Sequence, residues 1–236
     1  MNTVAGLLRA RVDDANTGYV FGDRSWSWSE VIHESAIRAA IIEQHLDDSR
    51  PPHIGVLLEN VPEYLFWIGG AAMVGACVVG INPTRRGAEL ERDVRHTDCQ
   101  LIVSDATGFA LLDGLDLGID RDHYFDIDSA DYQSLLGQHA DAVCPTTDPD
   151  GRRPLFLLFT SGSTSAPKAV VCTNERMAVT AVRAGQIYGV TADEVCYCPM
   201  PLFHGNALMA CWGPALAVGA KIVLRRKFSA SGFLDD

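Results

Sequence analysis

The sequence of 236 residues predicts an α/β fold in which mixed or parallel sheets are flanked by helices. Short apolar runs of strand length alternate with helical patterns along the chain, which is typical of βαβ units. No internal repeat or low-complexity tract interrupts this alternation. The length and the 47% share of hydrophobic residues are sufficient for one globular unit with a sizeable core.

The first part of the chain predicts a hairpin followed by a capped helix. Two short runs, residues 19–21 and 25–26, flank a Gly-Asp turn. Ser27 and Glu30 then have the spacing of a capping box, which marks the start of a helix. The strands expected next are residues 54–58, 76–79, 101–104 and 124–127, and the helices expected between them begin at Pro62, at Gly87 and near Phe109. Thr84 is expected to cap the second of these helices.

An uncharged stretch lies between Glu63 and Arg85, long enough to raise a transmembrane helix as an alternative. Pro62 instead suits the first position of a helix, and Gly75 suits the end of that helix. The residues after Gly75 then have the composition of a buried strand. We therefore expect a helix and a strand inside an α/β core, and no transmembrane segment.

A segment rich in Pro, Asp and Thr, residues 141–154, is expected to be a linker that separates two sheets. The elements expected after it are strands 155–159, 169–172, 195–198 and 221–224 and helices 174–188 and 206–216. Strand 221–224 is expected to lack a neighbour, and only a first helical turn follows it. Because such a strand would leave ladder groups and apolar side chains uncovered, we expect association into a homodimer.

The charge balance excludes one class of partner. Lys and Arg number 19 against 30 Asp and Glu, a formal net charge of −11. The phosphates of a nucleic acid would be repelled over most of such a surface. An anionic substrate must therefore be held by a local cluster of donors.

The seven cysteines are odd in number and scattered, and the N-terminus lacks the long apolar core of a signal peptide. Both features predict a reducing, cytoplasmic setting. Cys196 and Cys198 are too closely spaced for a zinc knuckle and have no second pair nearby. No metal-ligating residue is predicted.

A hydroxyl-rich segment, residues 160–168, contains five Ser or Thr residues, Gly162 and Lys168 between two predicted strands. Hydroxyls, backbone amides and an ammonium group suit a polyphosphate, and glycine allows its close approach. The segment does not follow the Walker A pattern, because Ala169 follows the lysine. A Ser/Thr-rich surface loop is the alternative that composition alone would favour.

The order of these residues resembles the signature of the adenylate-forming enzymes, which include acyl-CoA synthetases, firefly-type luciferases and peptide-synthetase adenylation domains. The matching positions are Thr160, Ser161, Gly162, Ser163, Thr164, Pro167 and Lys168. Ser165 and Ala169 stand where the pattern usually has glycine. An alanine after the lysine is familiar from the very-long-chain acyl-CoA synthetase and fatty-acid-transport branch.

Other stretches resemble the same branch in the same order, so that the resemblance spans nearly the whole chain. They are Asn60–Tyr64, Gly75–Ala76, Ile81–Leu90 and Pro201–His204. The last of them resembles the segment that lines the substrate pocket in that branch. The resemblance therefore implies that His204 borders the acyl substrate.

The resemblance implies the ATP-dependent activation of a fatty or related carboxylic acid to acyl-AMP and then to acyl-CoA. ATP, Mg²⁺ and coenzyme A are the small molecules it implies. Lys168 would be the catalytic residue, because its charge would stabilise the departing pyrophosphate. The implied phosphate-binding residues are Thr160, Ser161, Gly162, Ser163, Thr164 and Lys168. Fatty, very-long-chain fatty and steroid side-chain acids all remain open as substrates.

The family's later sequence blocks have no counterpart in residues 1–236. We therefore expect an incomplete N-terminal AMP-binding domain without its C-terminal domain. Such a fragment is expected to form no acyl-CoA by itself. The alternatives are a catalytically inactive folded fragment and a phosphate-binding module with a structural or regulatory role.

Overall fold

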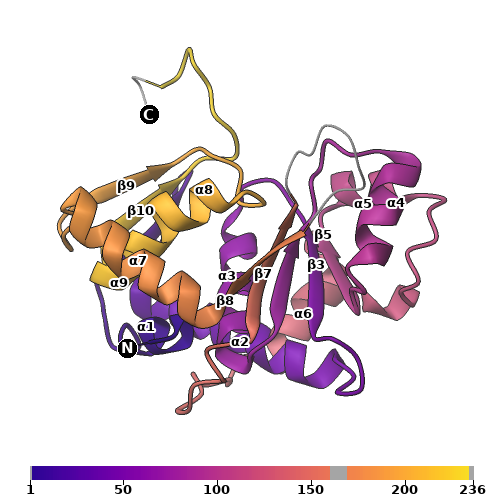
Figure 1. Cartoon of the computed structure of the whole chain (residues 1–236), viewed down its shortest axis with the longest axis horizontal. Helices are drawn as coiled ribbons and strands as arrows, with labels where there is room; N and C mark the ends of the chain where they lie inside the picture. The colour runs from indigo at the N-terminus through magenta and orange to yellow at the C-terminus, as the bar shows by residue number, and fades with distance from the viewer. Residues whose placement is uncertain (1, 160–168, 234–236) are drawn as a thin grey trace.

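The computed structural model describes residues 2–159 and 169–233 and contains two sheets with helices between and around them (Figure 1). The larger sheet has six strands in the order β6-β5-β3-β4-β7-β8. Its strands, in that order, are Tyr124–Asp126, Leu101–Ser104, His53–Leu57, Cys77–Gly80, Pro154–Phe159 and Ala169–Thr173. All neighbouring pairs are parallel except β7 with β8. The predicted α/β class with mixed sheets is confirmed.

The smaller sheet has four strands in the order β2-β1-β10-β9. These are Arg24–Ser27, Thr17–Phe21, Lys221–Leu224 and Val195–Cys198. The β1–β2 hairpin is antiparallel, whereas β10 runs parallel to both β1 and β9. The first and last parts of the described chain therefore build this sheet together.

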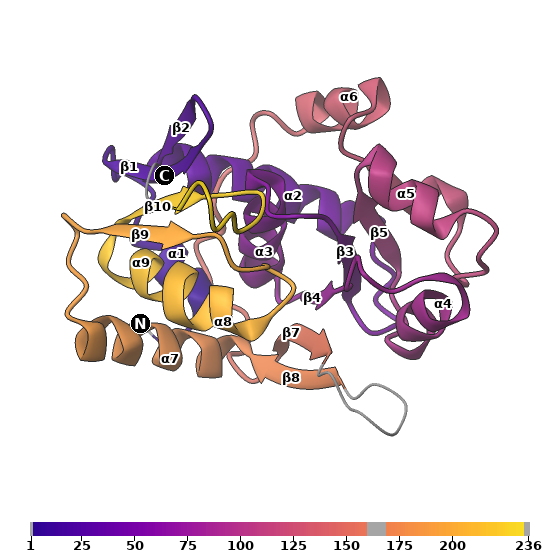
Figure 2. The ribbon, with the colours of Figure 1, turned by 90° about the horizontal axis from the view of Figure 1, so that it is seen from above.

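Helices fill the space between the sheets and cover their outer faces (Figure 2). The helices, with the 3-10 helix η1 and the π-helix η2, are α1 Val4–Arg9, α2 Trp28–His45, α3 Pro62–Val74, α4 Gly87–His96, α5 Ala106–Leu112, η1 Arg121–His123, α6 Ala130–Gln138, α7 Asn174–Tyr188, α8 Gly205–Ala207, η2 Leu208–Trp212 and α9 Gly213–Val218. One core cluster joins α2 and α3 to strands of both sheets, and a second lies under α4 and α5. The two sheets are thus held together by α3 and its neighbours.

Local sequence features place several element ends as predicted. The Ser27 hydroxyl oxygen accepts from the Glu30 amide at 3.2 Å, and the Glu30 carboxylate accepts from the Ser27 amide at 2.6 Å. Helix α3 begins at Pro62 and ends before Gly75, whose φ of 74° is the left-handed conformation that glycine adopts without strain. No helix in the described part of the chain is long and apolar enough to cross a membrane.

The segment 141–154 does not separate the two sheets, which corrects the prediction. Strand β7 begins at Pro154 and pairs with β4 inside the larger sheet, with Phe156 opposite Val78. Both side chains are buried, and burial of these apolar surfaces places β7 in that sheet. The boundary instead follows β8, because later strands join the β1–β2 hairpin.

The prediction that strand 221–224 lacks a neighbour is wrong. This strand, β10, lies between β1 and β9, and Ile222 pairs with both Tyr19 and Cys196. Ile222 and Tyr19 are fully or almost fully buried. The missing neighbour is supplied by the N-terminal hairpin, about 200 residues earlier in the chain.

Thr84 does not cap α4. The N-cap position is Arg86, whereas the Thr84 amide and hydroxyl both donate to Asn82 Oδ1, at 2.9 and 2.8 Å. This is an Asx turn, a local structure that competes with capping for the same groups. Helix α5 also begins earlier than expected, because Asp105 caps it through the Gly108 amide.

Candidate functional site

Loops of both sheets meet at the carboxyl ends of their strands. A side chain at Gly80, the last residue of β4, would place its Cβ 3.1 Å from Phe203 Cα. A Cβ at Gly205 would lie 3.5 Å from Leu158 near the end of β7. The loop that follows β9 therefore rests on the ends of β4 and β7. In open α/β sheets this is the edge at which ligands bind.

Asn60 fixes this loop through its side-chain amide. The residue is only 3% exposed. Its Nδ2 donates to the carbonyl oxygens of Met200 and Arg225, at 2.7 and 3.1 Å, and its Oδ1 accepts from the Leu202 amide at 2.9 Å. One side chain after β3 thus holds the loop after β9 and the end of β10. Sequence analysis placed Asn60 in a matching stretch but assigned it no role.

His204 lies at the rim of this region. It is exposed, its ring packs on Phe203 with centroids 4.3 Å apart, and its amide donates to the Pro201 carbonyl at 3.1 Å. Phe203 is buried and places the backbone of the loop against Gly80. His204 occupies the N-cap position of α8 but makes no side-chain capping bond. The structure therefore places this predicted site residue, exposed, at the carboxyl edge of the strands.

The predicted phosphate-binding residues lie outside the described part of the chain. They are Thr160, Ser161, Gly162, Ser163, Thr164 and Lys168. The described residues that bracket them, Phe159 and Ala169, pair with each other across β7 and β8. Leu158, one residue before Phe159, is the neighbour of Gly205 noted above. The bracketing strand end and the His204 loop are therefore close together.

A buried ionic network supports the start of α3, just after Asn60. Arg38 on α2 is 2% exposed, pairs with Glu34, and donates from Nε to Glu63 at 2.7 Å. Tyr132 on α6 donates to the same Glu63 carboxylate and accepts from Trp67 Nε1 at 2.9 Å. Burial alone would lower the pKa of Arg38, but the Glu63 carboxylate and other negative partners raise it overall, so the guanidinium remains charged.

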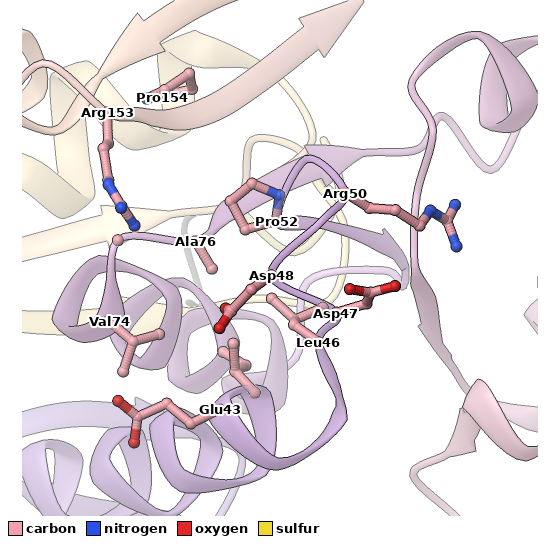
Figure 3. Close-up of a pocket in the computed structure, with 12 residues that line it drawn as sticks. Glu43, Leu46, Asp47, Asp48, Arg50, Pro52, Val74, Ala76, Arg153 and Pro154 are labelled. Atoms are coloured by element: carbon pink, nitrogen blue, oxygen red, sulfur yellow. The ribbon is translucent and has the colours of Figure 1, made fainter.

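A cavity of about 590 Å³ lies elsewhere, at the amino ends of the parallel strands (Figure 3). Pro52, Ala76 and Pro154, which precede or begin β3, β4 and β7, line it. The side chains of Arg153 and Asp48 extend beside this hollow in Figure 3. It is at the opposite edge of the sheet from His204. It is therefore separate from the predicted substrate site.

No group of three His, Cys, Asp or Glu side chains within residues 2–159 and 169–233 is arranged to hold a metal ion. All seven cysteines are free thiols.

The fold is shared with solved structures of other proteins. The N-terminal domain of FACL13 from Mycobacterium tuberculosis matches with a TM-score of 0.84 and 20% identity, over all of this chain and 60% of that one. MatB from Rhodopseudomonas palustris matches with a TM-score of 0.82 and 18% identity, over all of this chain and 47% of that one. At these identities the matches show the fold.

The family model described as AMP-binding enzyme matches residues 9–235, and the chain belongs to this family. It is 52% identical over 236 residues to the steroid-22-oyl-CoA synthetase of Rhodococcus jostii strain RHA1. This match covers 99% of this chain and 42% of the relative. It is 38% identical over 234 residues to the medium/long-chain-fatty-acid–CoA ligase FadD17 of Mycobacterium tuberculosis, over 99% of this chain and 45% of the relative. The chain thus spans less than half the length of these relatives.

Replacing Asn60 tests its role in holding the loop. Asn60→Ala is expected to lower the free energy of unfolding by about 1–3 kcal/mol, because buried carbonyl and amide groups lose their partner. Urea denaturation measures the change. Asn206→Ala is the control: Asn206 is exposed and, among the residues that the structure describes, its side chain bonds only Met200 Sδ, so its loss should stay within about 0.5 kcal/mol. Equal losses for the two variants would contradict the role assigned to Asn60.

Proposed function

We propose that the chain is the N-terminal part of an acyl-CoA synthetase that activates a carboxylic acid with ATP. The observation that carries the proposal is the position of the His204 loop on the ends of β4 and β7, beside the residues that bracket the hydroxyl-rich segment. The names of the two relatives support the same activity. The chain spans less than half of each relative, so the activity of the whole relatives is carried over to it only as a proposal.

The proposed reaction has two steps. A carboxylate oxygen of the acid attacks the α-phosphorus of ATP, so that an acyl-phosphate bond forms and pyrophosphate leaves. The thiol of coenzyme A then attacks the acyl carbon, a thioester forms and AMP leaves. Mg²⁺ enters as part of the MgATP substrate. Lys168 and the donors of Thr160, Ser161, Gly162, Ser163 and Thr164 would hold the phosphates, which is electrostatic catalysis without a protein nucleophile.

The acid itself is proposed to be a steroid side-chain carboxylate. The support is the 52% identity to the steroid-22-oyl-CoA synthetase, against 38% to the fatty-acid ligase. Medium-chain, long-chain and very-long-chain fatty acids are the competing substrates. All of these acids join a carboxylate to a large apolar body, so the assay must compare them directly.

A chimera tests the activity. Residues 1–236 replace the matching portion of the Rhodococcus relative, which supplies the remaining sequence. The chimera is expected to catalyse carboxylate-dependent exchange of pyrophosphate into ATP and to form a thioester, fastest with a steroid acid. Failure of a folded chimera in both assays, beside an active parent enzyme, would contradict the activity. Faster turnover of a fatty acid would contradict only the substrate.

His204→Ala in the chimera is expected to change the KM for the acid, or the order of preferred acids, while the melting temperature changes little. The reason is that an exposed loop side chain contributes little to packing. His96→Ala provides the control, since His96 is also exposed but lies at the end of α4. If His204→Ala lowers the melting temperature by several degrees and leaves the substrate profile intact, His204 is structural.

We also propose that the protein acts in the cytoplasm and that residues 1–236 associate with a second copy. The seven free thiols support a reducing compartment. Association is supported by β8, one of the two edge strands of the larger sheet, on which Val170 and Val171 are 50% and 53% exposed. This edge replaces β10 as the surface on which association would rest.

A further inference from the structure

Three of the seven cysteines meet where β9 packs against the π-helix η2. Cys196 and Cys198 are two residues apart on β9 and therefore lie on the same face of the strand. The Cys211 side chain, on η2, is the neighbour of both. Cys211 Sγ also lies 3.7 Å from the Tyr197 carbonyl oxygen. The proposed reaction uses none of these thiols.

The three thiols differ in exposure and in proton affinity. Cys196 is half-buried and open to solvent, whereas Cys198 is 0% and Cys211 5% exposed. The neighbouring Cys211 thiol lowers the pKa of Cys196, although burial and the Glu194 carboxylate oppose this effect. The Cys196 thiol in turn raises the pKa of Cys211, and contact with Cys198 and burial raise it further. An accessible nucleophile thus stands beside a protected, protonated thiol.

We propose that Cys196 and Cys211 are a peroxide-sensitive thiol pair that closes to a reversible disulfide. The Cys196 thiolate attacks one oxygen of hydrogen peroxide, the O–O bond breaks, and a sulfenic acid forms while the departing hydroxide takes a proton to become water. Cys211 sulfur then attacks the Cys196 sulfur, the S–O bond breaks, and the leaving hydroxide takes the Cys211 proton. Two thiols are oxidised and one peroxide is reduced to two waters; a thiol reductant reverses the bond.

The surroundings of the other cysteines confine this chemistry to the β9–η2 contact. Cys144 is also half-buried, but burial raises its pKa and its sulfur lies 3.7 Å from the Pro145 carbonyl oxygen. Cys77, Cys99 and Cys172 are at most 2% exposed, and burial raises the pKa of each. Cys144 is therefore the matched control, because it is half-buried like Cys196 but its pKa is not lowered by a neighbouring thiol.

The bond would tie the two ends of the loop that carries Phe203 and His204. This loop leaves β9 after Cys198 and enters α8 and η2 before Cys211. A covalent link between strand and π-helix would restrict opening of the intervening segment. Slower amide hydrogen exchange over residues 199–211 is therefore expected in the oxidised protein.

The test exposes folded residues 1–236 to equimolar hydrogen peroxide, alkylates the remaining thiols and maps disulfide peptides by mass spectrometry. We expect a Cys196–Cys211 peptide that dithiothreitol abolishes, with Cys196 consumed about tenfold faster than Cys144. Cys211→Ser should leave Cys196 as a sulfenic acid that a dimedone reagent traps. Cys196→Ser should prevent the disulfide, and Cys144→Ser should not.

Two results would overturn the proposal. One is equal or faster oxidation of Cys144 in the folded protein; the other is a disulfide that joins Cys198 to either neighbour in place of the Cys196–Cys211 bond. Far-ultraviolet circular dichroism confirms that each serine variant is folded before treatment. Because the experiment uses neither ATP nor an acid, its outcome is independent of the proposed synthetase activity.

Discussion

Lys168→Ala is expected to slow the adenylation half-reaction of the chimera by about ten- to a thousandfold, the range for loss of one preorganised charge-stabilising group. Negative charge builds up on pyrophosphate as its bond to the α-phosphorus breaks, and an ammonium group stabilises it more than water does. The overall charge of −11 provides no such stabilisation, so the effect of a local cation should be large.

Carboxylate-dependent exchange of labelled pyrophosphate into ATP measures this step without the thioester-forming step. Lys227→Ala is the control, because Lys227 is exposed in the charged run after β10. It should leave exchange unchanged. An unchanged exchange rate in Lys168→Ala itself would refute the assignment of residues 160–168 to the phosphates, even if the chimera remains an active synthetase.

Arg38→Leu is expected to lower the free energy of unfolding of residues 1–236 by about 3–5 kcal/mol, the range for removing one partner of a buried ion pair. The guanidinium is 2% exposed, and its loss would leave the Glu63 carboxylate, 14% exposed, without its cationic partner. Tyr132 would still donate to that carboxylate, but a single neutral donor does not replace a cation.

Urea denaturation of Arg38→Leu is compared with that of Arg50→Leu. The comparison separates the effect of breaking a buried ion pair from the effect of removing any arginine charge. Arg50 pairs with Asp98 at the surface, with side chains 38% and 51% exposed, so its loss should cost about 0–1 kcal/mol. Adding Glu63→Leu to Arg38→Leu should recover part of the stability, because the unpaired buried charge is then gone. Equal losses for the two arginine variants would show that the network contributes no more than a surface pair.

Some elements could not be predicted from local pattern. Helix α6 has one buried residue, Tyr132, so its sequence carries almost no apolar periodicity. What holds this residue is its hydrogen bonds to Glu63 and Trp67 on α3, made across more than 60 residues. The interruption of helix 206–216 by the π-helix η2 was likewise not expected, and Gly213 after it packs closely against Met177 of α7.

The sequence by itself determined the class of fold and most element positions, and the residues of the proposed site remain a prediction from it. Capping boxes, prolines at helix starts and glycines at helix ends act through bonds within a few residues, so their order in the chain is sufficient to recognise them. Only the tertiary structure decided that β7 belongs to the larger sheet, that β10 pairs with the N-terminal hairpin and that Asn60 holds the His204 loop. These depend on burial of apolar faces and on hydrogen bonds between residues more than 70 positions apart, which no local pattern specifies.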